Sequence, residues 1–71
     1  MERKRFSPTT GTHYMNCNGL EYVCLYVSVD GSALMQAVKS KWTFTAIDIG
    51  MYNDGTIDWA YSRGGYFDEN N

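Results

Sequence analysis

The segment Trp42–Tyr61, WTFTAIDIGMYNDGTIDWAY, constrains the fold most, because it encodes a β-hairpin together with its register. Its turn is Asn53-Asp54-Gly55, in which Gly55 can adopt a positive φ without a steric penalty. A type I turn with a glycine bulge gives a three-residue loop and puts three apolar pairs on one face: Met51 with Ile57, Ile49 with Trp59, and Ile47 with Tyr61. A two-residue loop would place Met51 opposite Asp58 and mix the two faces. The pattern therefore predicts the three-residue turn.

Further turns divide the rest of the chain into short strands. Asn18-Gly19 is a typical two-residue hairpin turn, and it predicts three cross-strand pairs: Cys17 with Leu20, Met15 with Tyr22, and His13 with Cys24. Asp30-Gly31 predicts a third turn, for which two-residue and three-residue loops both give acceptable faces. Ala33–Lys39 reads as the returning strand, although Ser32 could instead cap a short helix over residues 32–40. Gly64-Gly65 is expected to bend the chain.

Successive turns predict an all-β fold, a small antiparallel meander of about five strands. So few strands bury an apolar face only if the sheet curls or pairs with another copy. We expect an SH3-like or OB-like barrel or a curled sheet, with a small α+β sheet as the alternative if residues 32–40 are helical. The whole chain, residues 1–71, is predicted to be a single small domain, with residues 1–11 as a loose arm and residues 68–71 as a frayed tail.

The chain is rich in aromatic residues, with two Trp, six Tyr and three Phe among 71 residues. Each buries roughly 150–250 Å², so a small sheet can still form a core. The number of aromatics exceeds what so small a core needs, which predicts an exposed binding surface and a homodimer.

Charge is distributed unevenly along the chain. Three of the six basic residues form the run Arg3-Lys4-Arg5, whereas from Phe6 onward only three cations stand against seven acids. An acidic body repels phosphate backbones and disfavours dedicated nucleic-acid binding. It suits a basic protein partner better.

We expect a cytoplasmic protein. No apolar run approaches the ~20 residues that span a bilayer, and Ser7-Pro8-Thr9-Thr10-Gly11 follows the basic start in place of an apolar signal segment. In the cytoplasm Cys17 and Cys24 should stay reduced.

No motif indicates an enzyme, a metal site or a cofactor. In the Asn18-Gly19 register His13, Cys17 and Cys24 share a face, but His13 and Cys17 lie roughly 13 Å apart at ~3.4 Å per residue, too far for one zinc ion. Asp48 and Asp58 are expected as diagonal neighbours at roughly 7 Å. They lack a third polar group and a cleft, so we interpret them as part of a solvated face.

Trp42 and Phe44 are the most informative residues for function. They share a face with Asp48 and lie opposite Ile47 and Ile49. Either the strand turns a corner that keeps both sets inside, or Trp42 and Phe44 stand outside as an interface anchor. The second reading predicts a partner-binding surface made of Trp42, Phe44, Asp48, Asp58 and Thr56. A nucleic-acid surface would instead use Arg3, Lys4, Arg5, Lys39 and Lys41, with the two aromatics as a stacking groove.

Four motifs together resemble short uncharacterised proteins of bacterial phages and mobile elements: Asn18-Gly19-Leu20-Glu21-Tyr22, Trp42-Thr43-Phe44-Thr45-Ala46, Asp54-Gly55-Thr56-Ile57-Asp58-Trp59 and Gly64-Gly65. The resemblance covers residues 12–67 and carries over no catalytic residue. It implies a setting in which small proteins block or recruit larger host proteins. The sequence thus predicts a non-catalytic protein-interaction module, a phage-type inhibitor or accessory factor, with a single-stranded nucleic-acid-binding barrel as the alternative.

Overall fold

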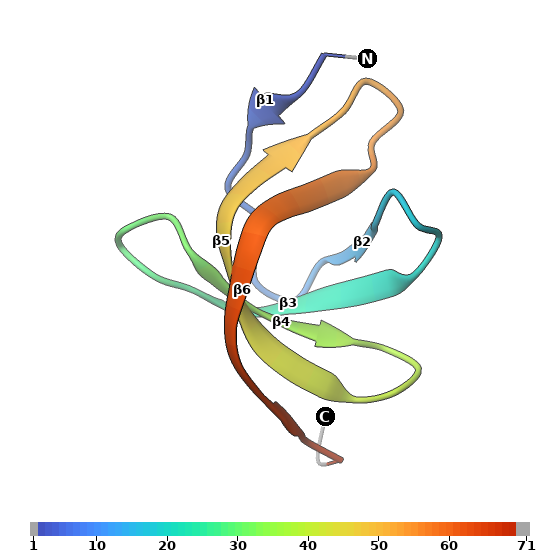
Figure 1. Ribbon diagram of the computed structural model, residues 1–71, viewed down its shortest axis with the longest axis vertical. Coiled ribbons are helices and arrows are strands. Elements are labelled where there is room, and N and C mark those ends of the chain that lie inside the picture. The colour runs from blue at the N-terminus through green and yellow to red at the C-terminus, as the bar shows by residue number, and fades with distance from the viewer. Residues whose placement is uncertain (1, 70–71) are drawn as a thin grey trace.

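The computed structural model describes residues 2–69 and folds them into one antiparallel sheet (Figure 1). Its strands are β1 (Lys4–Arg5), β2 (His13–Met15), β3 (Glu21–Val27), β4 (Ala33–Ala37), β5 (Trp42–Met51) and β6 (Ile57–Phe67). Strands β2 to β6 pair in chain order, and β1 joins β5 on the same edge as β4. The predicted all-β meander is confirmed. The helical alternative over residues 32–40 is wrong, because Ala33–Ala37 is strand β4.

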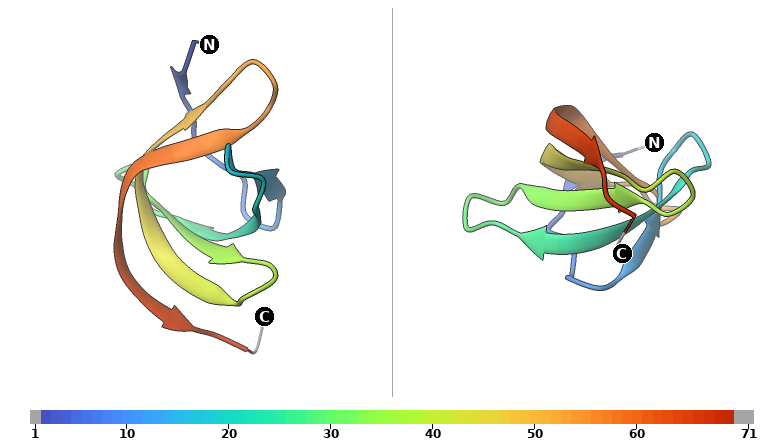
Figure 2. Two further views of the ribbon diagram at one scale, coloured as in Figure 1. Left: turned by 45° about the vertical axis from the view of Figure 1, so that its right-hand side comes forward. Right: turned by 90° about the horizontal axis from the view of Figure 1, so that it is seen from below.

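The sheet curls without closing into a barrel. Strands β5 and β6 pair along their whole length and bend together in a long arc (Figure 2). The two ends of the sheet meet at one parallel bridge, between Asn16 and Ile57. Of the architectures expected from the sequence, the curled sheet is the one observed.

Three hairpins use the same three-residue turn. They enclose Cys17-Asn18-Gly19, Val29-Asp30-Gly31 and Asn53-Asp54-Gly55. In each, the glycine has φ between 87° and 91° and donates its N–H to the residue before the loop. In each, the side chain of the Asn or Asp before the glycine accepts a hydrogen bond from the N–H of the residue that follows the glycine, at 2.9–3.0 Å. The predicted turn at residues 53–55 and its register are confirmed.

The two-residue turn predicted at Asn18-Gly19 is wrong. Asn16 donates its N–H to the Leu20 carbonyl, so the loop holds one more residue than predicted, and Tyr14 pairs with Tyr22. The shift of one residue moves side chains to opposite faces. The side chain of Asn18 stabilises the longer loop by accepting the N–H of Leu20.

The core lies inside the curl. Its buried apolar side chains are Tyr22, Cys24, Ala33, Met35, Phe44, Ala46, Ile49 and Ile57. Ala46 and Ile49 are three residues apart and would face opposite sides of a regular strand. Both are buried because Asp48, at φ 60°, turns the strand between them. The strand therefore turns a corner that keeps Phe44 and Ile49 inside.

The N-terminal segment is not the loose arm that its composition predicts. Phe6 donates its N–H to the Ile49 carbonyl and packs edge-to-face on Tyr14, with ring centroids 5.4 Å apart. Pro8 is buried. At the other end Asp68 is also held, since its N–H bonds to the Lys41 carbonyl. Met1 and residues 70–71 of the expected arm and tail lie outside the described residues.

Candidate interaction surface

The structure separates the five residues predicted to form a partner-binding surface. Phe44 is only 4% exposed and belongs to an aromatic cluster in the core. Its ring meets Tyr22 edge-to-face at 5.8 Å and Trp59 at 5.1 Å. The expectation that Phe44 projects outward beside Trp42 is therefore wrong, and Phe44 contributes to packing.

Asp58 lies at the far end of the sheet from Trp42 and is already engaged by two neighbours. It accepts hydrogen bonds from Arg3 Nε at 2.5 Å and from the Tyr52 hydroxyl at 2.6 Å. Partial burial raises the pKa of Asp58, but the bonds from Tyr52 and Arg3 outweigh it and leave that pKa below its usual value. Because the Arg3 guanidinium lies directly over Gly50 and also donates to the Asp48 carbonyl, it fastens β1 to the corner of the sheet.

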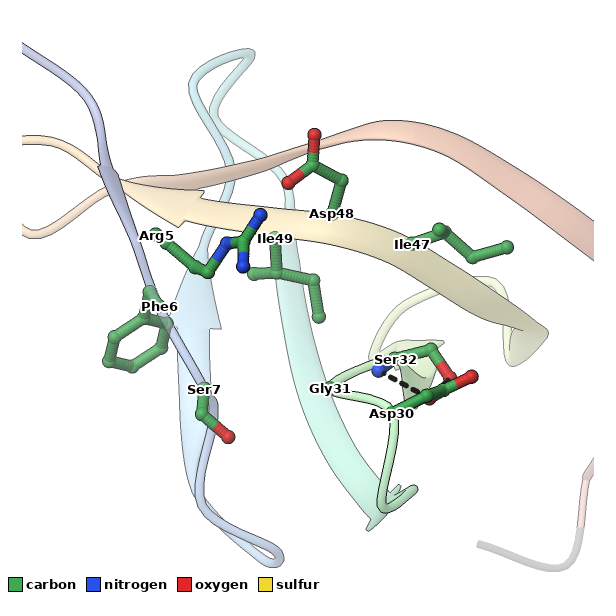
Figure 3. Close-up of a pocket in the computed structure, with 9 residues that line it drawn as sticks. All are labelled: Arg5, Phe6, Ser7, Asp30, Gly31, Ser32, Ile47, Asp48 and Ile49. Carbon is green, nitrogen blue, oxygen red and sulfur yellow. Dashed lines mark hydrogen bonds between the residues drawn. The ribbon is translucent and has the colours of Figure 1, made fainter.

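Thr56 and Asp48 belong to the same end of the sheet as Asp58. The Thr56 hydroxyl donates to Asp54 within the turn at 2.6 Å and lies 3.5 Å from Cys17 Sγ. The Asp48 side chain is exposed and lines a groove of about 420 Å³ with Arg5 and Phe6. Figure 3 shows this groove, in which Asp30 bonds to Ser32 within its own turn. All buried side-chain polar atoms of the described residues have hydrogen-bond partners.

Trp42 begins β5, beside the edge strand β6, and remains partly accessible. Its indole ring lies so close to Gly65 that a Cβ atom at that position would overlap Cζ2 and Cη2. The ring also meets Phe67 edge-to-face, with centroids 4.9 Å apart and planes at 65°. Trp42 is 37% exposed and Phe67 is 67% exposed.

Trp42 and Phe67 form a surface that we call the aromatic end. The neighbouring Tyr66 pairs with Thr43 and points to the other face of the sheet. A bulge in β6 that includes Gly64 and Gly65 brings Phe67 opposite Trp42, since Thr43 pairs with Tyr66 but Thr45 pairs with Arg63. Sequence reasoning missed Phe67. The signal that could have found it is the Gly-Gly pair directly before two aromatics, which permits a bulge and a close approach of a large ring.

The basic residues proposed for nucleic acid form two separate groups. Lys4 and Arg5 lie on β1, which pairs with the end of β5 near Met51. Lys39 and Lys41 lie in the loop before Trp42, at the other end of β5. Only this second group adjoins the aromatic end, and Arg3 is occupied by Asp58.

The cysteines and His13 do not come together. Cys24 is fully buried in the core, whereas Cys17 is exposed at the β2–β3 turn. His13 Nδ1 lies 2.7 Å from Glu21 Oε2 on the exposed face. Among residues 2–69 no cluster of three His, Cys, Asp or Glu side chains could hold a metal ion.

A second groove, of about 470 Å³, lies between the β2–β3 turn and the β4–β5 loop. Met15 and Leu20 line it and are about half exposed. Lys39 and Ser40 form its other side, where the Ser40 hydroxyl accepts the Trp42 N–H at 3.2 Å. Leu20 lies on the side formed by the β2–β3 turn and provides a control position for tests of the aromatic end.

No family model, curated protein or solved structure matched the chain. In the part of the chain that the structure describes, we found no helix with the length and apolar character to cross a membrane.

Proposed function

We propose that this chain is a non-catalytic protein-interaction module that binds its partner through the aromatic end. The observation that carries the proposal is the seating of Trp42, whose ring rests on Gly65 and against Phe67 while over a third of the residue stays exposed. Binding hot spots are enriched in Trp and Tyr. An aromatic held in place before binding loses little conformational entropy on association.

The chemistry around the aromatic end suits a protein surface. Trp42 and Phe67 offer an apolar centre, and the next residues of each strand end, Lys41 and Asp68, supply charges of both signs and are joined by a backbone hydrogen bond. Interfaces commonly combine such a centre with a polar rim. The acidic balance of the chain beyond its first residues favours a basic partner, through faster association more than through raw affinity.

The resemblance to short phage and mobile-element proteins extends this proposal to a biological setting. In that setting the module acts in the cytoplasm as an inhibitor or accessory factor on a larger host protein.

Single-stranded nucleic acid is the second candidate ligand, because Lys39 and Lys41 lie directly before Trp42. Bases stack on exposed aromatics, and nearby cations follow the phosphates. The separation of these lysines from Lys4 and Arg5 shortens any basic track, so we favour a protein partner.

The experiment is a quantitative capture of proteins from a bacterial host lysate by the immobilised chain, analysed by mass spectrometry. Phe67→Ala removes a ring that is 67% exposed, so the fold should persist while the specific partner is lost. Leu20→Ala, at an exposed apolar residue elsewhere, is the matched control and should retain the partner.

In parallel, a labelled single-stranded oligonucleotide is titrated at low and high salt. A salt-dependent complex that Trp42→Ala weakens would replace the protein proposal with the nucleic-acid one. If Phe67→Ala and Leu20→Ala reduce capture of the partner equally, the aromatic end is refuted as the binding surface.

A further inference from the structure

Strand β6 leaves most of one edge without a partner. Its other edge pairs with β5 along its whole length. Within residues 2–69 the free edge is bridged at one place only, where Ile57 meets Asn16. Residues from Ala60 to Phe67 are exposed, and Arg63 is the only charged side chain among them. Long edges of this kind template pairing with another strand unless they are blocked by charge, proline or a bulge.

The backbone groups available on this edge follow from the hairpin register. Tyr52 donates its N–H to the Thr56 carbonyl. Hydrogen-bonded and non-hydrogen-bonded pairs alternate along an antiparallel ladder, so Asp58, Ala60 and Ser62 point their backbone groups toward β5. Trp59, Tyr61 and Arg63 therefore point theirs outward, and the Gly64-Gly65 bulge ends this regular stretch.

We propose that a second copy of this chain occupies the edge, with the two β6 strands pairing antiparallel about a two-fold axis at Tyr61. In this register Tyr61 faces its own copy, and Trp59 faces Arg63 of the other chain. The three outward residues of each strand then satisfy one another's N–H and C=O groups. A two-fold axis makes the contact self-complementary and closes the assembly at two chains.

An axis at Ala60 or Ser62 would pair only two of the three outward residues of each strand. The registers beyond these are excluded by what flanks the free stretch. An axis at Trp59 would require the edge at Ile57, which Asn16 already bridges and where Cys17 Sγ approaches the carbonyl. An axis at Arg63 would put two arginines directly opposite each other and run into the bulge, and a parallel pairing in register would also align the arginines. Like charges facing each other destabilise a sheet. The axis at Tyr61 avoids all of these conflicts.

The dimer does not depend on the proposed partner surface, because it uses Trp59–Arg63 while the aromatic end uses Trp42 and Phe67. The two proposals therefore fail separately. Phe67→Ala should leave the dimer intact, and substitutions at Tyr61 should leave capture of the partner intact.

Sedimentation equilibrium with charge-swapped variants tests the proposal. The wild-type chain of 8.1 kDa should sediment as a dimer of twice that mass. Because residue 61 faces itself, Tyr61→Lys and Tyr61→Glu should each weaken dimerisation by at least about tenfold through like-charge repulsion. An equimolar mixture of the two should restore a dimer containing one of each. Tyr61 is 59% exposed, so both variants should keep the fold, which far-UV circular dichroism checks.

A cross-link provides a second measurement. Hydrogen-bonded antiparallel pairs hold their Cα atoms about 5.5 Å apart, within the range that a disulfide bridges. Tyr61→Cys in a Cys17→Ser background should oxidise to a covalent dimer, whereas Ala60→Cys in the same background should not. A wild-type monomer at about 200 µM, well above micromolar dissociation constants, would overturn the proposal. The proposal would also be overturned if Tyr61→Lys and Tyr61→Glu dimerised as strongly as the wild type, or if their mixture formed no dimer. A chain that stays monomeric alone and pairs only with a different protein would overturn it as well.

Discussion

Replacing Gly65 by alanine tests how the aromatic end is built. A Cβ atom there would overlap the indole ring of Trp42, and the φ of 150° is one that side-chain-bearing residues rarely adopt. The backbone strain should cost about 1–3 kcal/mol. Displacing Trp42 from Phe67 should add about 0.5–1.5 kcal/mol, the usual value of an aromatic pair. A chain of this length is expected to have a stability of roughly 4–11 kcal/mol, so the variant should still fold.

The assay is urea unfolding followed by far-UV circular dichroism, in a double-mutant cycle with Trp42→Ala. Without the indole only the strain remains, so Gly65→Ala should cost about 0.5–1.5 kcal/mol less in the Trp42→Ala background. Gly64→Ala is the matched control, because Gly64 is also left-handed, at φ 67°, but has no atom within 4 Å of the added Cβ. It should cost about 1–2 kcal/mol in either background. Equal costs of Gly65→Ala with and without Trp42 would refute the reasoning.

Two further predictions concern ionisable groups. Because hydrogen bonds from Tyr52 and Arg3 hold the pKa of Asp58 below its unfolded value, they stabilise the fold above that value, and this contribution is lost as the pH falls through the folded pKa. The melting temperature of Arg3→Gln should therefore lie below that of the wild type at neutral pH and converge with it only below the folded pKa, under the ordinary value of about 3.9. A constant difference at all pH values would contradict this. A disulfide exchange reagent should titrate one thiol, the exposed Cys17, in the folded chain and two in denaturant, since Cys24 is buried and burial raises its pKa. Two rapidly reacting thiols in the native chain would contradict the burial of Cys24. No reactive thiol would contradict the prediction that Cys17 is reduced.

The sequence identifies the hairpin of β5 and β6 because its apolar pattern fits only one loop length. A shift of one residue there would place Met51 opposite Asp58, so the register is determined locally. At Asn18-Gly19 the two-residue register gathers Met15, Leu20 and Tyr22 on one face, so the apolar pattern favours the wrong loop length. The structure resolves that case through the longer loop, which Asn18 stabilises with its own side chain.

Contacts between distant residues were harder to predict. The run Arg3-Lys4-Arg5 looks solvated by composition, yet Arg3 bonds to Asp58, 55 residues away. The corner at Asp48 depends on one left-handed residue, and it lets Phe44 and Ile49 both face the core. Trp42 lies at the start of β5 and stays partly exposed. Alternation within the segment allowed both outcomes, because it assumes a regular strand. The aromatic end was missed for the same reason, since the bulge at Gly64-Gly65 places Phe67 against Trp42.

The central claim is that binding runs through the aromatic end, and the affinity of Phe67→Ala for the captured partner tests it most directly. Isothermal titration with the purified partner should show a loss of at least about 30-fold, the level of a binding hot spot of about 2 kcal/mol. Leu20→Ala should stay within about threefold of the wild type, and both variants should unfold at wild-type urea concentrations. Wild-type affinity for Phe67→Ala, with its fold intact, would contradict the claim.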